Sequence, residues 1–139
     1  MDWKSKNILV TGGNGFLGSR LVKILKEKNT KKIVTPDSKK YDLRNVDNCT
    51  SVLKEIDIVF HLAAKVGGIG LNQSKPGELF YDNLMMGVNL MEEARKNKIE
   101  KFISLGTICS YPKFTPLPFK ENSIWNGYPE ETNAPYGLA

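Results

Sequence analysis

Cysteine and histidine are scarce in this chain. Among its 139 residues, two are cysteine and one is histidine. Cys49 and Cys109 lie far apart in unlike sequence contexts, so neither a disulfide framework nor the paired spacing of a zinc site is present. We therefore expect no metal centre, and two free thiols suit a reducing compartment.

Long hydrophobic runs are also missing. No uncharged apolar stretch approaches the roughly 18 residues that a membrane-spanning helix needs. The first residues, MDWKSKNILV, lack the apolar segment and small-residue cleavage site of a secretory signal. We expect a cytoplasmic protein with no membrane partner.

The net charge of +5 is unevenly distributed. Residues 1–44 hold eleven Lys or Arg and four acidic residues, and most of the basic ones follow Gly18. No aromatic residues are interleaved with the basic residues between Arg20 and Lys32, as a nucleic-acid interface would favour. A solvated helix face is the main interpretation, attraction for a small phosphate ligand is the second, and we expect no nucleic-acid partner.

Apolar patterning alternates between strands and helices. Short apolar runs predict strands over 6–12, 31–35, 57–64 and 101–107, and helical periods predict helices after Gly15, over 45–56 and over 76–98. This order predicts an α/β fold: a Rossmann-type parallel sheet with helices on both faces. We expect its four strands in the order 3-2-1-4, with later strands missing.

Two helices carry apolar faces with different implications. In the helix after Gly15, the predicted inward face is Leu17, Leu21, Ile24 and Leu25. The helix from Pro76 has a wider stripe, which consists of Phe80, Leu84, Val88 and Met91 and is extended by Leu79, Met86 and Leu90. Two interpretations stay open for this stripe: deeper burial than usual, or packing in a subunit interface.

The segment TGGNGFLG lies where the first strand becomes the first helix. Gly12, Gly15 and Gly18 have the spacing and context of a dinucleotide-binding turn. Gly12 permits the tight turn, Gly15 allows backbone to approach a pyrophosphate at the helix N-terminus, and Gly18 permits close helix packing. We therefore predict dinucleotide binding.

The end of the second strand bears on which dinucleotide is bound. An acid there hydrogen-bonds the ribose 2′-hydroxyl of NAD, whereas cations accept the 2′-phosphate of NADP. The chain has both kinds of residue, because Asp37 is followed by Ser38, Lys39 and Lys40. These residues alone leave NAD and NADP open.

Thr107 and Cys109 follow the fourth strand, at the edge of a parallel sheet where ligands and catalytic groups gather. Tyr136 lies in NAPYGLA, which has the character of the first turn of a helix. Taken alone, Thr107 is better explained as a strand-end hydrogen bonder, Cys109 as a small buried hydrophobe and Tyr136 as an ordinary core or surface aromatic.

Several segments together carry a family resemblance. They are TGGNGFLG, VFHLAAKVGGIG, YDNLMM, KFISLGTICSYPK and EETNAPYGLA. They resemble the extended short-chain dehydrogenase/reductase superfamily and, within it, the GDP-L-fucose synthases. The more specific signals are AAKVGGI, the cysteine two residues after the hydroxyl followed by YPK, and E-x-T-N-x-P-Y. The resemblance covers residues 7–139 but only part of the family's protein. It implies that residues 1–139 are an incomplete NAD(P)-binding Rossmann domain without the C-terminal substrate domain.

The resemblance also implies an activity. Members of the family convert GDP-4-keto-6-deoxy-mannose to GDP-L-fucose by 3,5-epimerisation and NADP-dependent 4-reduction, and we expect NADP, with NAD as the alternative. A nucleotide sugar and, at full length, a second copy in a homodimer are the implied partners. The fragment itself is expected to bind dinucleotide without turnover.

The implied catalytic residues are Thr107, Cys109 and Tyr136. Thr107 takes a hydroxyl position that is usually Ser in the family, and Tyr136 belongs to a Tyr-x-x-x-Lys motif whose lysine would be residue 140. Cys109 and a downstream histidine would exchange protons with the substrate, and His61 is not that histidine. The implied cofactor contacts are Gly12, Gly15, Phe16, Leu17, Gly18, Asp37, Ser38, Lys39, Leu62, Ala63, Ala64, Leu105, Gly106 and Tyr136.

Two alternatives remain open at this point. One is another nucleotide-sugar epimerase or dehydratase of the same superfamily, which shares the glycine pattern and HLAA. The other is a non-catalytic dinucleotide-binding module.

Overall fold

The computed structural model describes all 139 residues, which fall into two compact units. The first unit contains Met1–Ala64 and Met85–Leu105, and the second contains Lys65–Leu84 and Gly106–Ala139. The first holds the sheet and most of the apolar core.

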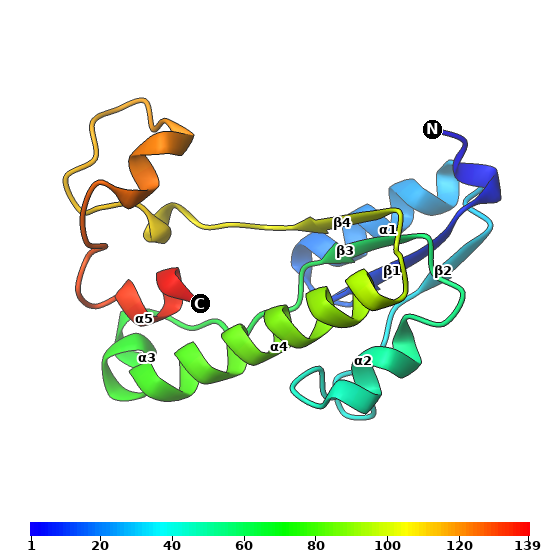
Figure 1. The fold of residues 1–139 in the computed structure, drawn as a ribbon, viewed down its shortest axis with the longest axis horizontal. Coiled ribbons are helices and arrows are strands. Elements are labelled where there is room, and N and C mark those ends of the chain that lie inside the picture. Colours follow the sequence, from blue (N-terminus) through cyan, green and yellow to red (C-terminus); the bar gives the residue numbers. More distant parts are fainter. The chain divides into compact units, whose positions relative to one another are not determined.

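The sheet has four parallel strands: β1 (Asn7–Thr11), β2 (Lys32–Val34), β3 (Ile58–His61) and β4 (Lys101–Ser104) (Figure 1). Leu9 lies at the centre of the register, opposite Val34 on one side and Val59 on the other. The predicted α/β fold with a Rossmann-type parallel sheet is confirmed.

The predicted strand order 3-2-1-4 is wrong. The observed order is β2-β1-β3-β4, so the third strand of the chain pairs with β1 on the side opposite β2. Burial of the strands accounts for this order: Ile58 and Val59 of β3 are fully buried, as a central strand requires, whereas no residue of β2 is buried, as suits an edge strand. β2 therefore lies at the edge of the sheet.

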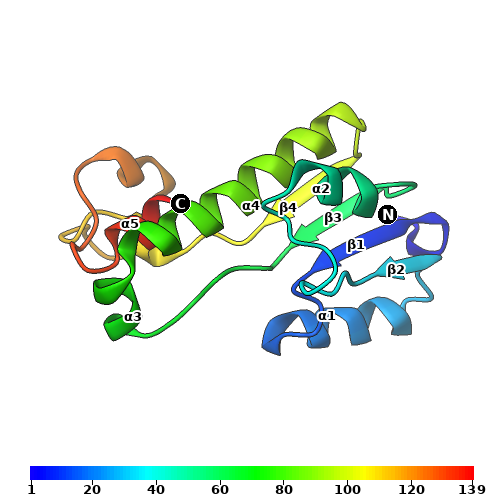
Figure 2. The ribbon, with the colours of Figure 1, turned by 90° about the horizontal axis from the view of Figure 1, so that it is seen from below.

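Helices cover both faces of this sheet, as predicted. Figure 2 shows α1 (Phe16–Glu27) on one side and α2 (Val46–Val52) with the C-terminal part of α4 (Pro76–Lys96) on the other. Side chains alternate between these layers, because Ile8 and Val10 of β1 pack with Leu25 while Leu9 packs with Leu53 and Leu90. None of the helices is both long and apolar enough to cross a membrane.

Helix α1 packs with a different face from the predicted one. Gly18, Leu21, Val22 and Leu25 face the sheet. Leu17 and Ile24 were predicted inward and are each 48% exposed. Gly18 has no side chain, so α1 can approach the backbone of Gly12 and Gly13 closely at this position.

The prediction that the apolar stripe of α4 is buried is also mostly wrong. Leu90 and Leu79 are buried, but Val88 and Met91 are each 53% exposed and Phe80 is 37% exposed. Polar residues take the inward positions because they have partners. Asn89 donates to the carbonyl of Arg44 over 2.9 Å, and Glu93 accepts from the Thr50 hydroxyl over 2.9 Å. The stripe therefore does not reflect deeper burial.

The second unit consists of short elements. They are α3 (Ile69–Ser74), the N-terminal part of α4, two 3-10 helices, η2 (Ile108–Ser110) and η3 (Glu121–Trp125), and α5 (Ala134–Leu138). The helical turn predicted in NAPYGLA is confirmed. The segment KVGGIG, between the strand predicted over 57–64 and the helix predicted over 76–98, contains the start of α3 at Ile69.

A buried hydroxyl joins the ends of β1 and β3. Thr11 Oγ1 accepts from the N–H groups of Leu62 and Ala63 over 3.1 and 3.2 Å and lies 2.8 Å from Nδ1 of His61. Since both N–H groups donate to it, the hydroxyl is left to donate its own proton to the imidazole, which must be neutral there. Burial lowers the pKa of His61 from its ordinary 6.5 to about 4.

The neutral His61 predicts a pH dependence of stability. A folded-state pKa below the unfolded one adds stability above about pH 6.5, and this stability is lost as the pH falls towards about 4. Between about pH 7 and pH 5 we expect a loss on the order of 2 kcal/mol from this residue. Urea unfolding of the wild type and of His61→Gln measures it. An equally steep loss in both proteins would contradict the assignment.

Candidate functional site

The turn from β1 into α1 is formed by backbone. Gly12 has a φ of 67°, in the left-handed region, and a Cβ there would lie 2.9 Å from the nitrogen of Ala63 and from the carbonyl of Leu62. The N–H of Gly15 donates to the carbonyl of Gly12 over 2.9 Å and closes the turn. Only glycine at position 12 satisfies both the dihedral angle and the packing.

Gly18 allows α1 to approach this turn closely. A Cβ at Gly18 would lie 2.1 Å from the Gly12 carbonyl oxygen. Gly15 is the N-cap, and neither a side-chain cap nor an acidic residue occupies the first turn. The first-turn N–H groups, which have no partner within the helix, therefore lie at a positive helix end beside the exposed residues Phe16 and Leu17, and this suits a pyrophosphate.

The residues after β3 lie beside the glycine turn. Leu62 and Ala63 are held there by Thr11, and the neighbouring Ala64 is exposed. These small and apolar residues suit one wall of a nucleotide site. His61 is buried and bonded to Thr11, so it has no access to a substrate.

The end of β2 also reaches the turn. A Cβ at Gly13 would lie 2.5 Å from Cγ2 of Thr35, so the following residues emerge next to the glycines. Asp37 uses Oδ1 to accept from the N–H of Lys39 over 2.9 Å. Ser38 and Lys39 are exposed. Acid and cation are thus both present at the predicted 2′-hydroxyl or 2′-phosphate position.

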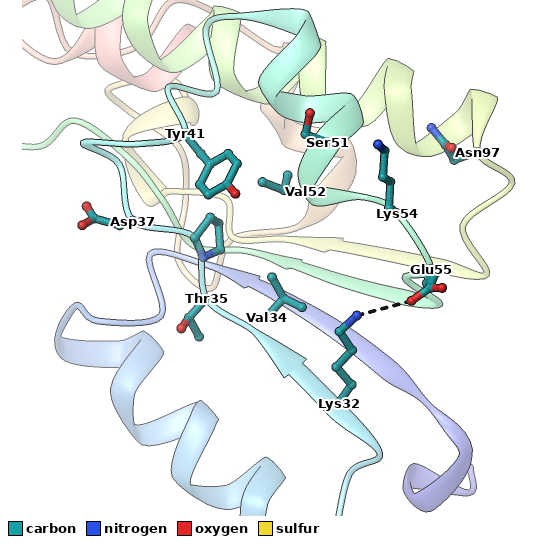
Figure 3. Close-up of a pocket in the computed structure, with 11 residues that line it drawn as sticks. Lys32, Val34, Thr35, Asp37, Tyr41, Ser51, Val52, Lys54, Glu55 and Asn97 are labelled. Carbon is teal, nitrogen blue, oxygen red and sulfur yellow. Dashed lines mark hydrogen bonds and ion pairs between the residues drawn. The ribbon is translucent and has the colours of Figure 1, made fainter.

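A groove of about 810 Å³ lies between β2 and α2 (Figure 3). Val34, Tyr41 and Val52 form its apolar floor, and the ion pair of Lys32 with Glu55 lies at one end. In Figure 3 the Asp37 carboxylate points away from the other lining side chains. The groove therefore borders the predicted ribose position without directing charged groups at it.

The predicted catalytic residues belong to the second unit. Thr107 is the N-cap of η2, and its Oγ1 accepts from the N–H of Cys109 over 3.2 Å. This bond leaves the hydroxyl proton of Thr107 free to donate to a ligand. Helix α5, which carries Tyr136, packs on the same turn, because Ser110 Oγ donates to the carbonyl of Gly137 over 2.5 Å. All three predicted side chains are half-buried.

Other predicted residues contribute less to a defined site. Leu105 is 59% exposed and Gly106 is exposed, and nothing packs where a Gly106 Cβ would lie. Cys49 is a buried thiol whose pKa burial raises to about 11, which suits packing and not reactivity. No group of three or more His, Cys, Asp or Glu residues could hold a metal ion.

The structure adds a carboxylate that the sequence analysis did not assign. Glu130 accepts from the hydroxyl of Thr132 over 2.6 Å and from the side-chain amide of Asn133 over 2.8 Å, just before α5. The bonds from Thr132 and Asn133 hold the pKa of Glu130 below its ordinary value. Asn133 also bonds the buried Asn72 over 3.1 Å. Glu130 is the first residue of the motif E-x-T-N-x-P-Y, but the sequence alone did not show which groups would hydrogen-bond to it.

Asn83 has a similar role in the loop after β3. Its side chain accepts from the N–H of Lys65 over 2.7 Å and donates to the carbonyl of the same residue over 3.0 Å. The Lys65 ammonium bonds Asp82 over 2.8 Å and also bonds Glu78. Hydrogen bonds from both the backbone and the side chain of Lys65 therefore hold this loop against the N-terminal part of α4.

Comparisons with known proteins agree with this geometry. GDP-mannose 3,5-epimerase 1 of Oryza sativa subsp. indica is 34% identical over 157 residues, which cover 98% of this chain and 40% of that protein. GDP-L-fucose synthase of Sinorhizobium fredii is 35% identical over 136 residues, covering 96% of this chain and 43% of its own length. The chain thus spans about two fifths of these relatives.

A solved structure shares the fold. The GDP-L-fucose synthetase of Naegleria fowleri, bound to NADP, superposes with a TM-score of 0.83 at 30% identity over 97% of this chain and 41% of its own. The family model for the NAD dependent epimerase/dehydratase family matches residues 8–139. The chain therefore belongs to the NAD dependent epimerase/dehydratase family.

Proposed function

We propose that this chain is the dinucleotide-binding part of an enzyme that converts GDP-4-keto-6-deoxy-mannose to GDP-L-fucose by 3,5-epimerisation and 4-reduction. The observation that carries the proposal is the seating of the Tyr136 helix on the turn that holds Thr107 and Cys109. The two elements in contact carry a hydroxyl, a thiol and a phenol. The same reaction is the activity implied by the sequence resemblance, and relatives named GDP-L-fucose synthase support it.

NADP is the cofactor we propose, and the residues present fit it. The uncapped start of α1 would hold the pyrophosphate, and Ser38 with Lys39 would lie at the 2′-phosphate. Relatives whose structures contain NADP or NADPH support this choice. When bound, the cofactor supplies a hydride for the C4 carbon of the sugar.

The chain's own residues would handle protons. Thr107 would hold the C4 oxygen by donating its free hydroxyl proton, and Tyr136 would give that oxygen a proton during reduction. Cys109 would exchange protons at C3 and C5, which the C4 ketone acidifies. A phenol loses and regains its proton readily at neutral pH only beside a cation, and a lysine at position 140 would supply it.

We further propose that the active enzyme is a longer, cytoplasmic polypeptide. The chain spans about two fifths of its relatives, and its second unit exposes large apolar side chains. Ile108, Phe114, Leu117 and Trp125 are 74%, 88%, 83% and 86% exposed. A substrate-binding domain following the Rossmann domain would cover such residues.

A second candidate activity is 3,5-epimerisation of GDP-mannose itself. The observation that favours it is the 34% identity to plant GDP-mannose 3,5-epimerases. The two candidates differ in the substrate that is consumed and in whether NADPH is used up. A non-catalytic module is the remaining alternative, and turnover by the full-length protein would exclude it.

A homodimer is part of the same proposal. The exposed stripe on α4 within the first unit, which consists of Val88 and Met91, is an apolar surface on one helix. Two copies related by a twofold axis would bury the same stripe against itself. We propose that this surface forms the dimer contact.

The glycine turn gives the first test. Gly15→Asp would cap α1 well, because Gly15 has an extended backbone at φ −78°. The added carboxylate would, however, repel a pyrophosphate bound at this helix end. Gly15→Asn is the matched control of the same size. We expect the chain to bind NADPH more tightly than NADH in calorimetry, and the Asp variant to bind at least about tenfold more weakly than the Asn variant. Equal affinities of the two variants would exclude a phosphate at this helix end.

Tyr136 gives the second test. In the full-length protein, Tyr136→Phe should lower NADPH consumption with GDP-4-keto-6-deoxy-mannose by roughly 100-fold or more, because the proton donor is lost. Tyr128→Phe, at an exposed tyrosine of the preceding loop, is the control and should stay near wild type. Comparable turnover in the Tyr136 variant would remove this residue from the mechanism. The isolated 139-residue chain should form no GDP-L-fucose.

The α4 stripe gives the third test. Val88→Asp should make the full-length protein monomeric in analytical ultracentrifugation, because a carboxylate cannot be buried unpaired in an apolar contact. Ser51→Asp, at an exposed position of α2, adds the same charge and should leave the dimer intact. A dimer that survives Val88→Asp would place the contact elsewhere.

A further inference from the structure

Helix α5 approaches the turn of η2 backbone to backbone. Gly137 is buried, and a Cβ at this position would lie 2.3 Å from the carbonyl oxygen of Cys109, 2.7 Å from its carbonyl carbon and 3.1 Å from the nitrogen of Ser110. These are main-chain atoms, so no side-chain rotation could relieve the overlap. The contact is possible only because residue 137 has no side chain.

Hydrogen bonds hold Gly137 in this contact from two directions. Ser110 Oγ donates to its carbonyl over 2.5 Å, and its own N–H donates to the carbonyl of Asn133 over 2.8 Å. Asn133 is in turn held by Glu130 and Asn72. The start of α5 is therefore fixed before the helix reaches Tyr136.

The partners in this contact are neighbours of the proposed catalytic groups. Gly137 follows Tyr136 directly, and the atoms it touches belong to Cys109 and Ser110, in the turn that Thr107 caps. A change in the distance between α5 and η2 would therefore move Tyr136, because Tyr136 is bonded directly to Gly137.

We propose that Gly137 and Ser110 are positioning residues, which set the place of Tyr136 relative to Thr107 and Cys109. This inference rests on the proposed function for its consequence in catalysis. A methyl group at residue 137 would have to retreat by roughly 1 Å to reach an ordinary contact distance, and a displacement of that size can cost about 100-fold in rate. Ser110→Ala removes one hydrogen bond without adding an overlap, so its effect should be smaller.

The test uses the full-length enzyme and reads its two half-reactions separately. Solvent deuterium entering C3 and C5 of the sugar reports proton exchange, which we assign to Cys109, and NADPH oxidation reports reduction, which needs Tyr136. We expect Gly137→Ala to lower NADPH oxidation by about 100-fold and deuterium entry much less, with NADPH affinity unchanged. Leu138→Ala, at the exposed next position of α5, is the matched control and should change neither.

Ser110 adds a graded series. Ser110→Thr keeps the hydroxyl and should retain reduction better than Ser110→Ala, although both change the same turn. Oxidation of NADPH by Gly137→Ala within twofold of Leu138→Ala, or an equal fall in both half-reactions, would overturn the positioning role. Thermal melting of each variant identifies one that is merely unfolded, and the serine series then decides the question.

Failure of the proposed function would be seen first in the wild type, as an absence of NADPH oxidation with this substrate. The positioning claim then has its own measurement. A crystal structure of Gly137→Ala should show α5 moved away from residues 108–110. An α5 that has not moved would overturn the inference whatever the substrate.

Discussion

The contact of Gly12 with the backbone of residues 62 and 63 is the constraint on which the rest of the first unit depends. It allows β1 to turn beside β3 while the buried Thr11 hydroxyl satisfies two N–H groups and the ring of His61. A side chain at position 12 would push the strand ends apart and leave buried polar groups unpaired. The position of α1 and its uncapped N-terminus follow from this turn.

The second unit also contains a glycine that lies directly against backbone atoms of another segment. There the glycine is Gly137, and the backbone it meets is that of Cys109 and Ser110. In both units a position without a side chain brings main-chain atoms together, and a hydroxyl, from Thr11 or from Ser110, donates or accepts across the contact. Each contact lies next to residues that the proposed chemistry needs, and hydrogen bonds to neighbouring residues fix it.

Local features of the fold were predictable from the sequence, and pairings between distant residues were not. The glycine spacing, the parallel α/β pattern and the helix at NAPYGLA follow from periodicity and turn chemistry within short windows. Strand order was mispredicted because it depends on which partner β3 pairs with, and short sequence windows do not contain that information. The prediction of a buried apolar stripe on α4 was mostly wrong for a similar reason. Asn89 and Glu93 can be buried because they hydrogen-bond to the carbonyl of Arg44 and to the hydroxyl of Thr50.

The candidate site likewise contains residues that could be predicted from the sequence and residues that could not. The glycines of the first turn, Thr107, Cys109 and Tyr136 could be singled out by residue type and resemblance. The roles of Glu130, Ser110 and Gly137 follow only from contacts between residues 2 to 28 positions apart in the chain. Single positions in a sequence do not show that a carboxylate will collect donors or that a helix will rest on a carbonyl group. Such residues hold the chemistry in place without taking part in it.

The central claim is that the glycine turn binds the phosphates of a dinucleotide. Titration of the uniformly ¹⁵N-labelled chain with NADPH, followed by amide chemical shifts, tests it most directly. We expect the largest shifts at the amides of residues 15–18, with a second group at residues 37–39. Saturating NADPH that leaves the amides of residues 15–18 unmoved would contradict the account.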